Sequence, residues 1–145
     1  MVSRFEPSNR GVLFGWDVLV VDDDPGSLEV ARILLAFYGA NVITAVNGAE
    51  GLAKVVEERP RFIVTDLSMP VMDGWELIKR LKADHTLAQI PIIALTAHAM
   101  VGDREKALAA GCHNYMSKPL TPATFMQDLI KLLIVIPEFA EALSA

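Results

Sequence analysis

The sequence has a single cysteine, fewer basic than acidic residues, and no long apolar run. Its one cysteine, Cys112, excludes an internal disulfide framework and a zinc site built from several cysteines. The formal net charge of −5 argues against non-specific nucleic-acid binding, which needs basic patches that neutralise phosphates. No apolar run approaches the roughly 20 residues of a membrane-spanning helix, and no small-residue cleavage site follows the apolar residues 12–14. We therefore expect a cytoplasmic protein that contacts neither membrane nor nucleic acid.

The length of 145 residues fits one domain, with a core large enough to need no disulfide support. The polar, turn-rich composition of the first residues predicts an N-terminal extension over residues 1–15. We expect the folded domain over residues 16–137 and a C-terminal tail over residues 138–145.

Five short runs predict β-strands at residues 18–21, 41–46, 62–64, 92–95 and 114–116. The runs at 18–21, 62–64 and 92–95 are continuously apolar, which is typical of strands covered on both faces of a parallel sheet. The run at 41–46 is more polar, so we expect it nearer an edge. Helical spacing of apolar residues predicts helices between and after the strands, at residues 27–38, 47–58, 75–84, about 100–110, and from Thr121-Pro122 to a break or kink at Pro137.

Strands that alternate with helices pair in parallel through right-handed crossovers, so the sequence predicts an α/β domain with a doubly wound sheet. The carboxyl ends of all strands in such a sheet meet at one rim, where ligands bind. Polar residues stand within two positions of the ends of four predicted strands: Asp22-Asp23-Asp24, Asp66, Thr96 and Lys118.

Carboxylates gathered at one rim repel one another, by about 4 kcal/mol for two unit charges 4 Å apart at an effective dielectric of 20. A divalent cation and the Lys118 ammonium would together neutralise Asp22, Asp23 and Asp66. Oxygen ligands of this kind suit Mg²⁺. Asp24 precedes Pro25 and is better explained as a cap on the next helix, so no metal role is assigned to it.

These motifs, in this order and at these spacings, resemble the receiver domain of two-component response regulators. The resemblance covers roughly residues 17–136 and implies a flavodoxin-like fold: one five-stranded parallel sheet with strand order 2-1-3-4-5 and helices on both faces. The residues that carry it are Val20-Val21-Asp22-Asp23-Asp24, Asp66-Leu67-Ser68-Met69-Pro70 with Asp73-Gly74, Leu95-Thr96-Ala97, and Lys118-Pro119.

The resemblance implies a role for each residue at the rim. Asp66 would accept a phosphoryl group from the phosphohistidine of a histidine kinase or a histidine phosphotransfer protein. Asp22, Asp23, Asp66 and the backbone carbonyl of Ser68 would hold Mg²⁺. Lys118 would pair with Asp66 and then with the phosphoryl oxygens. Such a protein is a signalling phosphoacceptor, not an enzyme, although it assists its own phosphorylation and dephosphorylation.

The resemblance also implies a switch. Thr96 would donate its hydroxyl to the phosphoryl group, and Tyr115 would change rotamer together with Thr96. The Lys118–Pro119 peptide bond would be cis. Ser68 and His98, each two residues beyond a predicted site residue, are candidates for tuning the access of water to the acyl phosphate.

The signal must then leave the domain. No output domain follows in this sequence, so we expect it to pass through a downstream protein target or by onward phosphate transfer. The resemblance places the output face on the fourth helix, fifth strand and fifth helix. Residues 129–136 are apolar almost all round, which indicates either a partner, such as a second copy in a homodimer, or a cover formed by residues 12–16 or by the tail.

Two rival functions stay open at this point. A phosphatase with an aspartyl-phosphate intermediate also places an aspartate after a strand, but it typically needs a second aspartate two residues on, where this chain has Ser68. A binding module that is never phosphorylated would keep the acidic rim without using it.

Overall fold

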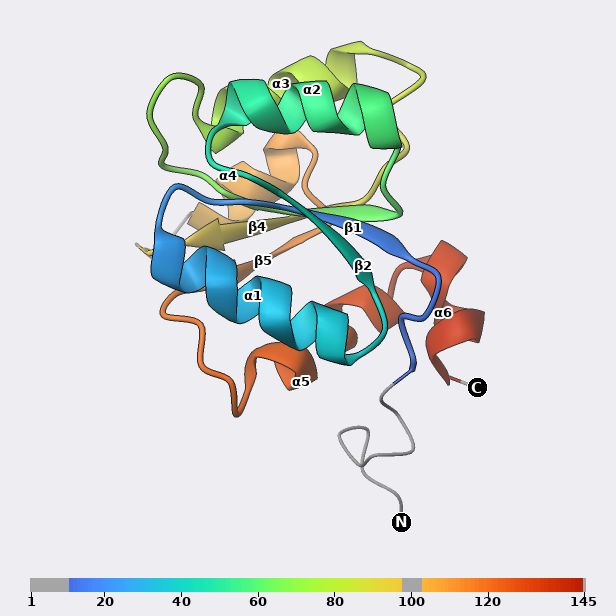
Figure 1. Ribbon diagram of the computed structural model, residues 1–145. Helices are drawn as coiled ribbons and strands as arrows, with labels where there is room; N and C mark the ends of the chain where they lie inside the picture. The colour runs from blue at the N-terminus through green and yellow to red at the C-terminus, as the bar shows by residue number, and fades with distance from the viewer. Residues whose placement is uncertain (1–10, 98–102, 145) are drawn as a thin grey trace.

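The computed structural model describes residues 11–97 and 103–144, which form a three-layer α/β domain (Figure 1). All five strands are parallel, and their order β2-β1-β3-β4-β5 confirms the predicted fold class. The elements in chain order are β1 (Asp17–Val21), α1 (Pro25–Phe37), β2 (Asn41–Ala45), α2 (Gly48–Glu58), β3 (Phe62–Asp66), α3 (Gly74–Ala83), β4 (Ile92–Thr96), α4 (Asp103–Ala110), β5 (Asn114–Ser117), α5 (Phe125–Ile134) and α6 (Pro137–Ser144).

The helices cover both faces of the sheet. Helices α2, α3 and α4 lie on one face, and α1, α5 and α6 lie on the other (Figure 1). Successive strand residues point to opposite faces, so Val18 and Val20 enter the core under α1 and α5, whereas Leu19 and Val21 enter the core under α2 and α3. Strands β3 and β4 are buried along their whole length, and β2 is partly exposed at its predicted place on an edge.

Side-chain caps fix where three of the helices begin. Asn47 accepts a hydrogen bond from the Glu50 N–H at the start of α2. Asp24 caps α1 through the N–H of Ser27, which confirms its assignment as a cap. Asp73 caps α3 in the same way.

The predicted start of the last long helix is wrong. Thr121 precedes a turn over residues 122–124, and α5 begins only at Phe125. The Thr121 carbonyl accepts hydrogen bonds from the N–H groups of both Thr124 and Phe125, so this stretch closes as a tighter turn before the regular helix. The predicted start of α4 near residue 100 lies outside the described residues.

The tail forms a helix that packs on the domain. Helix α5 ends at Ile134, and Pro137 opens α6, whose Phe139 and Leu143 are buried. The Phe139 ring lies 4.8 Å from the Trp16 ring, centroid to centroid. The segment that precedes β1 therefore contacts helix α6. The sequence left open whether a partner or the tail covers the apolar residues 129–136. Helix α6, formed by the tail, packs against them, and Val135 stays exposed.

The expected domain boundaries at residues 16 and 137 remain a prediction. Leu13, in the expected extension, is completely buried in the same core as Phe139 and Leu143. No helix in the described ranges combines the length and the apolar character needed to cross a bilayer.

Candidate functional site

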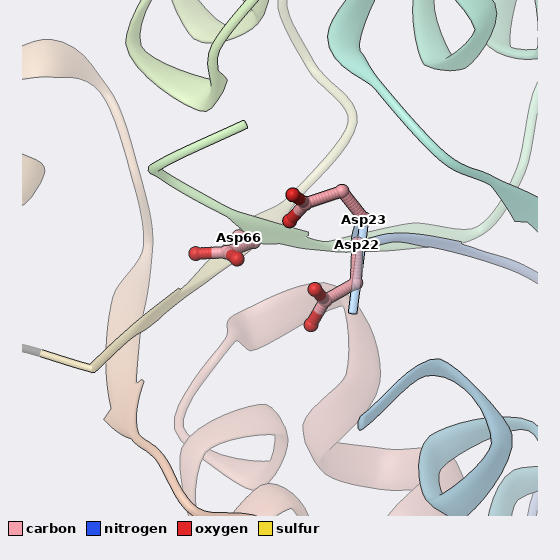
Figure 2. A group of neighbouring side chains, drawn as sticks. All are labelled: Asp22, Asp23 and Asp66. Atoms are coloured by element: carbon pink, nitrogen blue, oxygen red, sulfur yellow. The ribbon is translucent and has the colours of Figure 1, made fainter. Parts of the chain in front are cut away.

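The parallel sheet brings acidic side chains from two neighbouring strands to one rim. Asp22 and Asp23 directly follow β1, and Asp66 is the last residue of β3, the strand paired with β1. Figure 2 shows the three side chains side by side. One carboxylate oxygen from each lies within 4.8 Å of the others. The predicted acidic cluster is therefore present in the structure.

Lys118 crosses to this cluster from the end of β5. Its Nζ donates hydrogen bonds to Asp66 Oδ2 at 3.0 Å and to Asp22 Oδ1 at 3.1 Å. Nζ also lies 2.8 Å from Asp22 Oδ2, an ion-pair contact without hydrogen-bond geometry, so this buried oxygen has no hydrogen-bond donor among the described residues. The Lys118–Pro119 bond is cis, as expected.

Burial affects the pKa values of Asp22 and Lys118 in this cluster. It raises the pKa of Asp22 above its usual value, and this effect outweighs the lowering by Lys118 and by the N–H of Asp24. Burial also acts to lower the pKa of Lys118, but the hydrogen bonds and charges of Asp22 and Asp66 outweigh it, so the net shift is upward. Lys118 therefore stays an ammonium at neutral pH, and it is the cation that the buried carboxylates face.

The loop after β3 wraps closely around Asp66. The N–H of Ser68 donates to Asp66 Oδ1 at 3.2 Å, and the N–H of Gly74 donates to the Leu67 carbonyl at 3.1 Å. A side chain at Gly74 would collide with the Asp66 carbonyl oxygen and would lie 2.8 Å from the Leu67 Cα atom. Only glycine leaves room for the start of α3 to pass this close to Asp66.

The remaining predicted residues lie on the neighbouring strands. Thr96 ends β4, next to β3, and it is 7% exposed. Its carbonyl accepts the Lys118 N–H at 2.8 Å, which ties the ends of β4 and β5 together. Tyr115 lies half-buried on β5 opposite Ala94. His98 lies outside the described residues.

Sequence reasoning found the charged residues of the rim but missed two features. One is the close approach at Gly74, for which the Asp73-Gly74 dipeptide was a usable signal. The other is a groove beside Ser68 and Thr96 that is formed by α3 and α4. No sequence signal marks this groove, because it forms only where the loop after β3, the start of α3 and helix α4 come together in the fold.

Comparison with known proteins identifies the family to which this chain belongs. Residues 18–130 match the response regulator receiver domain family.

The chain is a member of the receiver domain family.

Its relatives include small regulators and receiver domains of known structure. The polar-differentiation response regulator DivK of Brucella anthropi is 38% identical over 112 residues, which span 77% of this chain and 91% of DivK. The chemotaxis response regulator CheY4 of Vibrio cholerae has a TM-score of 0.74 at 32% identity, over 81% of this chain and 98% of CheY4.

A third relative bears on the acidic cluster. The receiver domain of the sensor histidine kinase PA1611 from Pseudomonas aeruginosa has a TM-score of 0.72 at 32% identity, over 81% of this chain and 97% of that chain. Its crystal structure holds a magnesium ion in the active-site cleft. The acidic cluster of Asp22, Asp23 and Asp66 in this receiver domain has the same type of donor atoms that such an ion requires.

Proposed function

We propose that Asp66 accepts a phosphoryl group from the phosphohistidine of a histidine kinase or histidine phosphotransfer protein. The observation that carries this proposal is the pairing of Asp66 Oδ2 with the Lys118 ammonium at 3.0 Å, next to two further carboxylates. A carboxylate is a usable nucleophile towards phosphorus where positive charge offsets the charge that develops during transfer. The similarity to a receiver domain of a sensor histidine kinase supports the choice of donor.

The donor atoms around Asp66 fit Mg²⁺. They are all oxygens, and the cluster includes a buried oxygen, Asp22 Oδ2, that no described residue satisfies with a hydrogen bond. Asp22, Asp23, Asp66 and the backbone carbonyl of Ser68 would hold the ion. When bound, it would offset the charge of the carboxylates and of the phosphoryl oxygens.

The side chains around Asp66 would make the remaining contributions to phosphoryl transfer because the fold holds them in position. An oxygen of the Asp66 carboxylate bonds to phosphorus while the P–N bond of phosphohistidine breaks. The imidazole leaves with the electron pair of that bond and takes up a proton from water. The Lys118 ammonium pairs with the phosphoryl oxygens, and the Thr96 hydroxyl donates a hydrogen bond to them. Phosphoryl transfer needs little more than this positioning and charge stabilisation.

Phosphorylation would act on other proteins through a shift between two arrangements. We expect the phosphoryl group on Asp66 to favour one position of Thr96 and of Tyr115, which lies on the adjacent strand. This shift would change the face formed by α4, β5 and α5, which is where we expect a downstream target to bind. Ser68 and His98 would tune the rate at which water removes the phosphoryl group, and an unchanged dephosphorylation rate in His98→Ala would exclude His98 from this role.

Labelling with a small phosphodonor tests the acceptor. The chain, incubated with acetyl phosphate and Mg²⁺, should gain the mass of one phosphoryl group, and the label should be stable in acid and lost in base. Asp66→Asn should abolish the label, whereas Asp128→Asn on the exposed side of α5 should keep it. An unlabelled wild-type chain would favour a binding module, and rapid turnover of many phosphomonoesters would favour a phosphatase.

A further inference from the structure

The loop between β3 and α3 makes a rare turn at its tip. Val71 has a φ of 68°, in the left-handed region, and the N–H of Met72 donates to the Pro70 carbonyl at 2.8 Å. A hydrogen bond between residues two apart, around a positive φ, defines the rare and strained form of the γ-turn. A β-branched residue is especially unfavourable there. The Val71 side chain is 84% exposed, so its own packing does not hold the turn.

The start of α2 holds this turn from outside the loop. The N–H of Gly48, the first residue of α2, donates to the Met72 carbonyl at 2.8 Å. A Cβ atom at Gly48 would lie 2.5 Å from that carbonyl oxygen and 3.0 Å from the carbonyl oxygen of Asp73. Only glycine therefore lets α2 come close enough for this hydrogen bond, the α2 clamp.

The segment between the clamped turn and the candidate site is stiff. Only Met69 and Pro70 separate Ser68 from Val71. The ring of Pro70 fixes its φ, and Met69, as the residue before a proline, is restricted to extended backbone. The Ser68 N–H donates to Asp66 Oδ1, and the Ser68 carbonyl is a proposed ligand of Mg²⁺. A displacement of the turn is therefore passed on to Ser68.

Helix α2 is also tied to the strand that carries the other carboxylates. The Asp22 N–H donates at 3.0 Å to the carbonyl of Ala45, which ends β2 three residues before Gly48. Val55 of α2 and Val21 of β1 are buried in the same core. The helix therefore connects the end of β1 with the loop that follows β3.

We propose that Gly48 is a positioning residue for phosphoryl transfer. Through the α2 clamp and the turn at Val71, it sets where the Ser68 backbone lies relative to the carboxylates that would hold Mg²⁺. The inference rests on the proposed function. Backbone strain of the kind seen at Val71 persists only where surrounding contacts impose it, and it is concentrated at functional sites.

Two substitutions at Val71 separate the role of the backbone from that of the side chain. Proline cannot adopt a positive φ, so Val71→Pro abolishes the turn, whereas Val71→Gly keeps it. Both remove the exposed valine side chain. Titration with Mg²⁺, followed by calorimetry, should show an affinity about tenfold lower in Val71→Pro, the loss typical when a contact that orients a metal ligand is removed. The affinity of Val71→Gly should be close to that of the wild-type chain.

Gly48→Ala tests the clamp itself. The new methyl group collides with the Met72 carbonyl oxygen, so the Mg²⁺ affinity should again fall by about tenfold. Gly39→Ala is the matched control: Gly39 has a φ of 102°, and its Cβ atom would lie 2.9 Å from backbone atoms of Phe14. Gly39 precedes β2, at the end of the sheet opposite the acidic cluster. Both variants should unfold at lower urea concentrations, and only Gly48→Ala should bind Mg²⁺ more weakly.

Three results would overturn the positioning role. They are a wild-type Mg²⁺ affinity in Val71→Pro, equal losses in Val71→Pro and Val71→Gly, and equal losses in Gly48→Ala and Gly39→Ala. If Gly48→Ala does not fold, the pair of variants at the exposed Val71 decides the question.

The wild-type chain reports separately on the proposed function. If it binds Mg²⁺ and is labelled by acetyl phosphate while Val71→Pro and Gly48→Ala match it in affinity, the positioning role fails and Asp66 remains the acceptor. If the wild-type chain is not labelled, the proposed function fails, and the role of Gly48 in phosphoryl transfer fails with it. A wild-type chain that binds no Mg²⁺ would overturn both the metal site and the positioning role.

Discussion

At the scale of single residues, Asp23 and Asp24 are neighbours with different surroundings. The Asp24 carboxylate is occupied by the N–H and the hydroxyl of Ser27, where it caps α1. The Asp23 carboxylate is exposed and lies in the cluster with Asp22 and Asp66. The same substitution at the two positions therefore separates the proposed metal ligand from a structural cap.

Asp23→Asn should weaken Mg²⁺ binding by about tenfold or more, because the site loses one of its few carboxylates. Asp24→Asn should bind Mg²⁺ as the wild-type chain does, because asparagine is also a good cap. Titration with Mg²⁺, followed by calorimetry, measures both affinities. Equal losses in the two variants would contradict the assignment of Asp23.

Gly74 sets how closely α3 approaches Asp66. Gly74→Ala should destabilise the protein by about 1–3 kcal/mol, because the new methyl group collides with backbone atoms of Asp66 and Leu67 that cannot move freely. Gly26→Ala in the first turn of α1 meets nothing closer than 3.9 Å and should change stability by less than about 1 kcal/mol. Urea unfolding of both variants makes the comparison, and a Gly74→Ala protein of wild-type stability would count against the close packing described.

Cys112 is buried, and this burial raises the pKa of its thiol to about 12. Since the thiolate is the reactive form, the folded protein should not react with iodoacetamide at pH 8. The same thiol should react readily once the chain is unfolded in urea, and intact mass reports both results. Rapid alkylation of the folded protein would show that Cys112 is accessible.

Residue identity predicted the charged part of the site well, for a physical reason. A short apolar strand followed by a charged residue places that residue at the rim of a parallel sheet, so Asp22 and Asp66 could be predicted. Lys118 follows a strand that is less apolar, and the Lys118-Pro119 motif of the resemblance marked it. The unsatisfied Asp22 Oδ2 and the backbone contact at Gly74 could not, because both depend on atoms brought together from distant segments.

At the scale of secondary structure, α6 is the element that the sequence left open. Its Phe139 packs on Trp16 and on Phe62 at the start of β3, and the Arg61 guanidinium lies over the Trp16 ring, 4.4 Å from its centroid. An apolar tail after a proline is compatible with a free tail, a partner contact or a packed helix. Only the shape of the surface beneath it decides between them.

Phe139→Ala should destabilise the protein by about 3–5 kcal/mol, because it removes a completely buried ring between α6 and the sheet. Glu138→Ala, at an exposed position on the same helix, should cost little. Thermal and urea unfolding of the two variants give the difference. A small effect of Phe139→Ala would mean that α6 does not pack on the domain in solution.

Sedimentation of the full chain separates this internal cover from the alternative of a homodimer through the last helices. We expect a monomer, with or without a phosphoryl mimic, because α6 already occupies part of the apolar surface of α5. A dimer that strengthens with concentration would point to the surface that remains, including Val135.

At the scale of the whole molecule, the sheet order joins segments that are far apart in the sequence. Strands β1, β3 and β4 are neighbours, so Asp22, Asp66 and Thr96 come to one rim from three separate segments of the chain. Lys118 reaches the same rim from β5 and contacts both Asp22 and Asp66. Alternation of strand and helix predicts this arrangement from the sequence, whereas the groove between α3 and α4 emerges only from helix packing.

The central claim is that this rim makes Asp66, and not its acidic neighbours, the phosphoacceptor. Borohydride reduces an aspartyl phosphate to homoserine, so trapping after incubation with acetyl phosphate and Mg²⁺ marks the acceptor permanently. Peptide mass mapping should then find homoserine at position 66 alone. Homoserine at position 22 or 23, or at no position in the labelled wild-type chain, would contradict the account.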